Sequence, residues 1–191
     1  MGNAKNLVMG PGTIYVMTYD DNNPTASEPL DSQFNNVPPV SAWTDVGWTV
    51  GGLQFTVMNT WKELEADQIT ETPERRRTKK EVQFKTQLGE VTFDNLVLTL
   101  AGGTVTTDAA KQIYKPPSDN SSTTPPYQKL IFDGKAGKNA TRRVTMRKVL
   151  STENIELAHS KEDQTVIPVT FTTHYVSATV ESWKMVTEVV P

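Results

Sequence analysis

The chain has 191 residues and a formal net charge of -3, from 19 Lys and Arg against 22 Asp and Glu. This length suits one domain over residues 1–191 with a sizeable core, and the net acidity argues against a dedicated nucleic-acid binder. The absence of cysteine excludes disulfides and thiolate metal sites. No apolar run approaches the roughly 20 residues of a membrane-spanning helix, and residues 1–5 have no signal-peptide character. We expect cytoplasmic synthesis and no membrane anchor.

Residue patterning predicts the first strands of a sheet. Residues 13–19 are rich in β-branched and aromatic side chains, which favours a strand. Residues 20–42 hold several prolines and asparagines without periodicity, which predicts a long loop. Apolar and polar residues then alternate over residues 53–58 and again over residues 82–87. The alternation predicts two half-buried strands that pair with each other.

A short helix is predicted after the second of these strands. Four apolar residues recur at i, i+3, i+4 and i+7, which places them on one face of a helix. They are Phe93, Leu96, Val97 and Leu100. Thr92 is suited to the N-cap and Gly102 to the left-handed residue that follows a helix. A helix this short is marginal alone, so we expect the four apolar side chains to pack it against a sheet.

The rest of the chain is β-like. A loop over residues 114–127 is rich in Pro, Ser and Thr, and β-like segments follow at residues 127–132, 143–150, 165–176 and 180–189. Pro168 cannot donate to a ladder, which predicts an edge or a bulge there. The expected fold is mainly β: a two-sheet sandwich or partly closed barrel with one short flanking α-helix.

The sequence offers few residues that could form a catalytic, cofactor-binding or metal-binding site. His159 and His174 are the only histidines and lack the spacing of a metal site. No Gly-x-Ser-x-Gly nucleophile elbow exists, and the glycine pairs match neither dinucleotide-binding nor phosphate-binding loops. Nothing in the spacing of the carboxylates selects an acid–base pair. We therefore predict no catalytic, cofactor-binding or metal-binding residues, and no enzymatic activity.

Residues 61–81 form a charged arm with an acidic and a basic part. The arm's candidate subunit-interface residues are Trp61, Glu63, Glu65, Asp67, Arg75, Arg76, Arg77, Lys79 and Lys80. Three interpretations are open: a solvated hairpin tip, an assembly arm that pairs with a neighbouring copy, or a nucleic-acid patch, which the net acidity disfavours. Exposed ion pairs contribute only about 0–1 kcal/mol each, but repeated along an assembly they fix register and steer association.

The order of several segments along the chain carries a resemblance to a known family. The segments cover residues 12–16, 43–52, 88–103, 142–149 and 164–171. In this order they resemble the major tail (tail-tube) protein of long-tailed bacteriophages. The resemblance covers most of the chain, and the loops 20–42 and 114–127 are where we expect departures from the family.

The resemblance implies a structural virion protein. Six copies would close a ring, and rings would stack into a tube through which DNA passes without specific binding. Residues 61–81 would be the stacking arm and residues 1–9 a terminal arm, both ordered only in the tube. The implied partners are further copies of the chain, the tape-measure protein, and the tail-tip and terminator proteins. The implied location is the virion tail.

One alternative belongs to a different class. A non-enzymatic β-sandwich binding or decoration module would be a stable monomer or small oligomer, with its tryptophans on an open face. Tryptophans in a β protein more often pack in the core. At Trp61, where the first strand enters the arm, we expect packing or subunit contact.

Overall fold

The computed structural model describes residues 11–33, 36–65, 69–117, 124–159 and 163–189. The predicted terminal arm 1–9, Asp67, and part of the loop 114–127 lie outside these residues. Asp31–Gln33 and Gly137–Asn139 are short 3-10 turns. The strands and the helix, in chain order, are β1 (Thr13–Thr18), β2 (Thr44–Asp45), β3 (Thr49–Leu64), β4 (Glu74–Leu88), α1 (Phe93–Thr99), β5 (Thr104–Asp108), β6 (Lys111–Lys115), β7 (Gln128–Lys135), β8 (Thr141–Ser151), β9 (Ile167–Thr173) and β10 (Trp183–Thr187).

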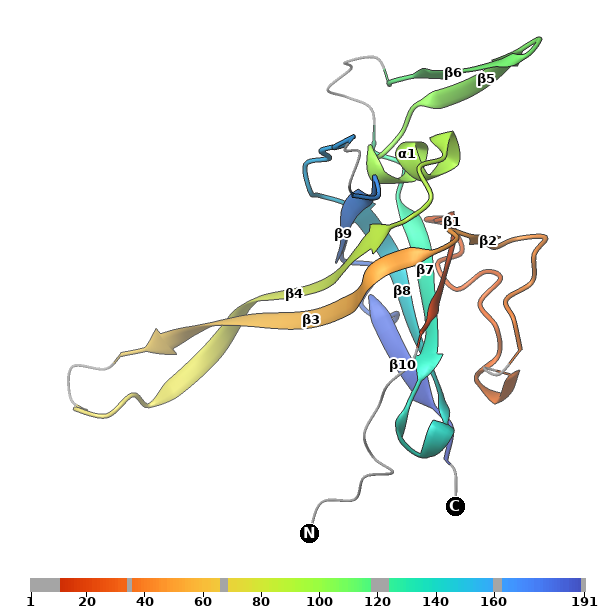
Figure 1. Cartoon of the computed structure of the whole chain (residues 1–191). Helices are drawn as coiled ribbons and strands as arrows, with labels where there is room; N and C mark the ends of the chain where they lie inside the picture. The colour runs from red at the N-terminus through yellow and green to blue at the C-terminus, as the bar shows by residue number, and fades with distance from the viewer. Residues whose placement is uncertain (1–10, 34–35, 66–68, 118–123, 160–162, 190–191) are drawn as a thin grey trace.

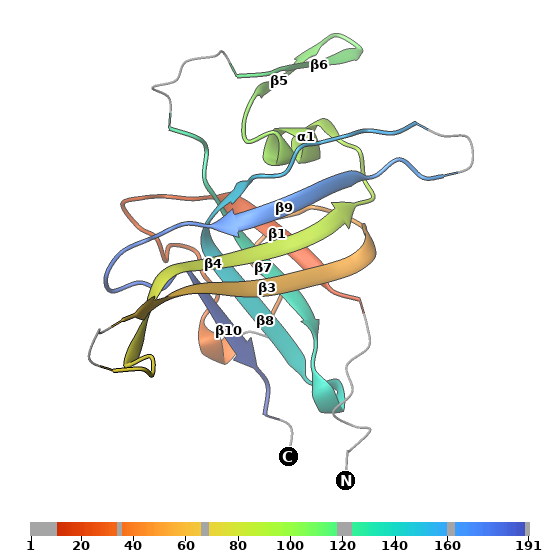
Figure 2. The ribbon, with the colours of Figure 1, turned by 90° about the vertical axis from the view of Figure 1, so that its left-hand side faces the viewer.

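The main sheet follows the order β2-β1-β7-β8-β9-β4-β3, with β10 also paired to β8. β8 changes partner along its length: residues 142–146 pair with β10, and residues 149–151 pair with β9. The sheet therefore folds into two layers, and Figure 2 shows β3, β4 and β9 crossing in front of β1, β7, β8 and β10. The predicted β-sandwich with one short helix is confirmed. Its end strands β2 and β3 do not pair, so the sheet is not a closed barrel.

The core lies between these two layers. Aromatic rings meet across it, Phe84 of β4 with Phe132 of β7 at 5.6 Å between ring centroids, and Phe55 of β3 with Trp183 of β10 at 5.2 Å. The alternation of β4 buries Val82, Phe84 and Thr86, as predicted, and Leu88 beyond them. Pro168 lies on β9 beyond the residues that pair with β8, so the predicted local edge is confirmed.

The helix begins where the sequence predicts. The Thr92 Oγ1 accepts a hydrogen bond from the backbone N–H of Asn95 at 3.2 Å, which caps the N-terminus. At the other end the Gly102 N–H donates to the Val97 carbonyl at 2.9 Å, a Schellman closure. The residue in the left-handed region is Ala101, with φ 52°, while Gly102 has φ 135°. The prediction of Gly102 as the left-handed residue is therefore wrong by one position.

The helix packs on a different face from the one predicted. Its buried residues are Asn95, Leu98 and Thr99. Of the predicted face Phe93, Leu96, Val97 and Leu100, Leu96 packs against the core, Phe93 stacks on Tyr114 of β6, and Leu100 is 43% exposed. The face that carries Asn95 is turned inward instead, because the Asn95 amide donates to the Val46 carbonyl at 3.0 Å and to the Glu90 carbonyl at 2.9 Å.

A second, two-stranded sheet was not predicted from the sequence. β5 and β6 form a hairpin next to α1, outside the sandwich (Figure 1). Its residues are mostly exposed, so they have no core-facing alternation to reveal strands. Tyr114 attaches the hairpin to the body, because its hydroxyl donates to the Gly102 carbonyl at 3.0 Å.

Replacing Asn95 tests the packing of the helix. In Asn95→Ala the carbonyls of Val46 and Glu90 lose their amide donor, and leaving such groups unpaired costs about 1–3 kcal/mol each when they are buried. We expect the free energy of unfolding, measured by urea denaturation, to fall by at least that amount. Asp94→Ala, at the exposed neighbour, should cost under about 1 kcal/mol, mainly through the helix dipole; equal losses would contradict this account.

Candidate assembly surfaces

The charged arm is the outer part of one long hairpin. β3 and β4 pair continuously from Thr49 opposite Leu88 to Leu64 opposite Glu74, apart from two register shifts. Figure 1 shows the outer half of this hairpin reaching away from the sandwich. The paired residues of both limbs form one backbone ladder within a single chain, and ordering of the arm only in the tube stays a prediction.

Two irregularities shape the hairpin. At the base, Gly51 and Gly52 have φ of 76° and 80° and stand between the pairs Val50–Gln87 and Leu53–Thr86. Farther out, Thr78 is the extra residue between the pairs Thr60–Lys79 and Trp61–Arg77. Its hydroxyl donates to the Thr60 carbonyl at 3.2 Å. β-Bulges of this kind bend a strand and increase its twist, so both sites set the direction of the arm.

The acidic and basic residues of the arm lie side by side. Glu63 is opposite Arg75, and their side chains form an ion pair at 2.5 Å. Lys79 pairs with Glu81 and lowers the pKa of that carboxyl by hydrogen bonding to it. Within the described part of the chain, Arg76 and Arg77 have no carboxylate at ion-pair distance. The arm thus presents two guanidinium groups that are available to a partner. Exposed Glu65 follows β3, at the outer end of the arm.

Trp61 lies on the arm rather than in the core. Its side chain is 56% exposed, and with Glu63 and Arg75 it lines a shallow depression. Alternate residues of a strand share a face, so Trp61 continues the face on which Phe55 packs in the sandwich. Lys80, on the opposite limb, lies 5.7 Å from the centre of the Trp183 ring. The side chain of Trp61 is placed where a partner can contact it.

The outer edge of β3 is free. β3 is the last strand of the sheet path and pairs only with β4 among the described strands. Its 16 residues therefore leave a row of backbone N–H and C=O groups without a strand partner. β10 likewise pairs only with β8. Long unpaired edges favour pairing with another chain, so both edges are candidate contact surfaces.

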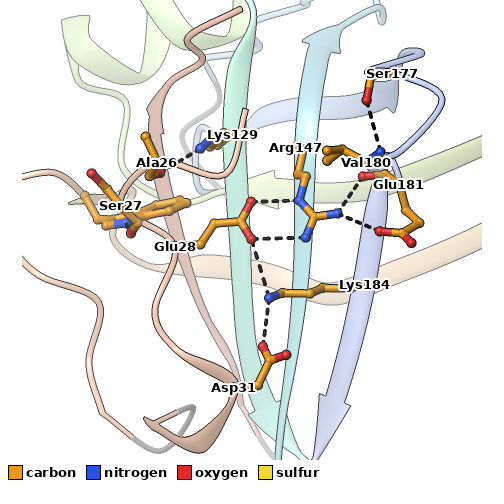
Figure 3. A network of polar contacts seen from close by, with 11 residues as sticks. Ala26, Ser27, Glu28, Asp31, Lys129, Arg147, Ser177, Val180, Glu181 and Lys184 are labelled. Carbon is orange, nitrogen blue, oxygen red and sulfur yellow. Dashed lines mark hydrogen bonds and ion pairs between the residues drawn. The ribbon is translucent and has the colours of Figure 1, made fainter. Parts of the chain in front are cut away.

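A buried ion-pair network holds the loop 20–42 against the sandwich. The Arg147 guanidinium of β8 donates to both carboxylate oxygens of Glu28, at 2.8 and 3.1 Å (Figure 3). Both side chains are only 6% exposed. Burial acts to lower the pKa of Arg147, but the hydrogen bonds that it donates to Glu28 and Glu181 and the negative charges of both carboxylates together outweigh burial, so this pKa is raised. Lys184 of β10 extends the network to Glu28 and Asp31, at 3.5 and 2.7 Å.

Two further buried cations hold the same loop. The Lys129 ammonium of β7 donates to the Ala26 carbonyl at 2.7 Å, and burial lowers its pKa. Arg143 forms a bidentate pair with Asp133 and donates to the Asn36 carbonyl at 2.7 Å. These buried cations were not predicted from the sequence. The signal was present, because Arg143 and Arg147 alternate with Val144 and Met146 on a strand that is covered on both faces.

Comparison with known proteins identifies the family. A model of the phage tail tube protein family matches residues 1–189. This chain belongs to the phage tail tube protein family. A search of curated proteins found no match. The family establishes a structural component of the virion tail that assembles with further copies of itself into a tube.

The informative features of this tail tube protein lie on its surface. The described residues include no group of three or more His, Cys, Asp and Glu placed to hold a metal ion. In the same part of the chain, no helix has both the length and the apolar character to cross a membrane. The features that stand out are the arm, the free strand edges and the exposed tryptophans, all of which suit contacts between copies.

Replacing Glu28 tests the buried network. Glu28→Gln keeps the shape of the side chain but leaves Arg147 without its buried counter-charge, a change that typically costs about 3–5 kcal/mol. We expect the free energy of unfolding to fall by that amount in urea. Glu63→Gln removes an exposed pair and should cost no more than about 1 kcal/mol. If Glu28→Gln were as mild as Glu63→Gln, the network would not hold the loop.

Proposed function

We propose that this chain forms six-membered rings that stack into the phage tail tube, through which DNA passes. The observation that carries the proposal is the family match over residues 1–189. The long free edge of β3 and the projecting arm support it, because they are suited to lateral and axial contacts respectively. In this proposal residues 1–191 act as one tail-tube domain without catalytic activity.

The rings would close through strand edges. A neighbouring subunit that pairs with a free edge satisfies its backbone groups, which gives affinity without a deep pocket. β3 and β10 are different edges, so a contact between them is heterologous. Such a contact closes a ring when its rotation divides the circle. The sandwich itself would change little, since its core is complete in one copy.

The rings would stack through the arm 61–81, with residues 1–9 as a second, terminal arm. Arg76 and Arg77 supply positive charge that the described part of their own chain does not neutralise. A matching acidic surface on the next ring would fix the rotation between rings, because each ion pair is repeated in every subunit. The loops 20–42 and 114–127 would be the parts specific to this protein.

The lumen would let DNA slide without binding it. The chain carries a net charge of -3, and an acidic or neutral wall repels phosphates instead of retaining them. The subunit would be made in the host cytoplasm and end in the virion tail. There it would meet the tape-measure protein inside the tube and the tail-tip and terminator proteins at its ends.

Electron microscopy tests this function directly. The purified protein at high concentration, with and without the tail-tip complex as initiator, would be imaged in negative stain. We expect hollow tubes of uniform width, with six-fold symmetry in end-on views. A monodisperse monomer across salt, concentration and initiator would contradict the proposal and favour a binding or decoration module.

Removing the basic side chains of the arm tests its role. The triple variant Arg75→Ala, Arg76→Ala, Arg77→Ala should raise the protein concentration needed for tube formation at least ten-fold, because the stacking contact loses its charge. Its melting temperature should stay within a few degrees of the parent, since all three side chains are exposed.

The matched control removes three exposed lysines outside the arm: Lys111→Ala, Lys115→Ala and Lys135→Ala. It changes net charge equally and should leave assembly near that of the parent chain. Sedimentation of tubes and circular dichroism would measure the two effects. Equal assembly by both triple variants would remove the arm from the mechanism.

A further inference from the structure

Trp48 is an exposed tryptophan on an unusually well-fixed backbone. Its side chain is 80% exposed, although its own backbone is bonded on both sides. Its N–H donates to the Glu90 carboxylate at 3.1 Å, and its carbonyl accepts from the Gly89 N–H at 2.7 Å. Within the described part of the chain, the ring stays largely uncovered.

The residues before Trp48 are fixed in the same way. The Gly47 N–H donates to the Asp45 carboxylate at 2.8 Å, and the Val46 carbonyl accepts from the buried Asn95 amide at 3.0 Å. Gly47 has φ 84°, and a Cβ there would lie 2.3 Å from the Glu90 carboxyl group. The turn therefore requires glycine and presents the Trp48 ring from a rigid support. A preorganised anchor of this kind binds with a smaller loss of conformational entropy.

Apolar and acidic residues lie close to Trp48 along the chain and through the hydrogen bond of its backbone N–H. Exposed Val50 follows it on β3, and exposed Val91 follows the Glu90 that bonds it. Glu90 also lines a hollow together with Asp45 and Asp94, and the described residues that line it include no lysine or arginine. We call Trp48, Val50, Val91, Asp45, Glu90 and Asp94 the Trp48 surface. It combines an aromatic anchor with negative charge.

The arm carries the complementary features. It presents exposed Trp61 beside Arg77, its cross-strand partner, and Arg76 next to it. Trp48 immediately precedes β3 and Trp61 lies near the outer end of that strand, roughly 40 Å apart at about 3.3 Å per residue. The arm therefore cannot reach the Trp48 surface of its own chain, but the arm of a second copy can. Tryptophan and arginine are also the residues that most often dominate binding energy at interfaces.

We propose that the Trp48 surface is the receptor for the arm of a second copy of this chain. In this contact Arg77, which shares the face of Trp61, lies against the carboxylates of the hollow and stacks on the Trp48 ring. Arg76, on the other face of the arm, adds positive charge at the rim of the contact. Because the arm and its receptor are different surfaces, the contact is heterologous and can be repeated without limit along a tube. The inference rests on the proposed role of the arm in assembly and names the surface that receives it.

Cross-linking between copies tests the contact, because the chain has no cysteine of its own. Lys62→Cys places a thiol beside Arg76 on the arm, and Val91→Cys places one on the Trp48 surface. The two proteins would be mixed, assembled into tubes and treated with a short bis-maleimide. We expect covalent dimers in the mixture and none from either protein alone.

The matched control mixes Val91→Cys with Lys115→Cys, an exposed position outside the arm, and should give no dimers. Tubes without dimers between positions 62 and 91 would overturn the inference and leave the proposed function intact. Dimers from Lys62→Cys alone would mean that arms contact arms, which also overturns it. Absence of tubes under every condition would overturn the proposed function and the inference together.

Trp48→Ala provides a second, independent measurement. The side chain is exposed, so the melting temperature should change by no more than a few degrees. The concentration needed for tube formation should rise at least ten-fold, because the anchor of the receptor is lost. Tyr175→Ala, which removes another exposed aromatic ring, should leave assembly unchanged. Assembly of Trp48→Ala at the parent concentration would overturn the inference.

Discussion

β3 and β4 pair over a greater length than the second layer of the sandwich covers. The exposed arm results from this difference in length. The inner half of the pair, around Phe55 and Phe84, closes the sandwich. The outer half keeps its backbone ladder but has no second layer, so its side chains are exposed. A two-stranded ribbon alone is only marginally stable in water. Here it is anchored by a core at one end, which keeps it extended and leaves the other end for a partner.

The sandwich can anchor the arm because its second layer is held rigidly. β8 pairs with β7 on one side and divides its other side between β10 and β9, which joins the two layers. Its outward face carries buried Arg143 and Arg147, and the loop 20–42 supplies Glu28 to Arg147 and the Asn36 carbonyl to Arg143. Buried ion pairs add little net stability against an apolar alternative. Any other position of the loop would leave the buried charges without their partners, so the ion pairs specify one position of the loop.

Assembly requires surfaces that are already rigid in one copy and that still have unpaired or exposed groups for the next copy to contact. The free edge of β3 has this property, because its backbone is ordered by β4 but unpaired outward. Trp48 has it too, since Asp45, Glu90 and Asn95 fix the turn that presents an exposed ring. Under the proposed function these two features share one role, which is contact between copies of this tail tube protein. Preorganisation lets many weak contacts add up, because little entropy is lost at each one.

The sequence by itself determined what depends on near neighbours in the chain. Alternation over residues 82–87 indicated a half-buried strand, because period two is a local property. Thr92 indicated the start of the helix, because an N-cap bonds within its own first turn. The order of segments indicated the family. The charges of residues 61–81 also identified the arm as the region of interest. Each of these signals lies within a short window of residues.

Tertiary structure decided what depends on residues far apart. Glu28 and Arg147 are separated by 119 residues, and nothing local links them. Trp43 is buried and Trp48 is exposed, although they stand in one short motif, because burial depends on which layers meet at each position. The helix turned Asn95 inward for a similar reason, since its partners come from the β2–β3 connection and from the segment after β4. Packing is a property of the whole fold, so a single sequence window cannot reveal it.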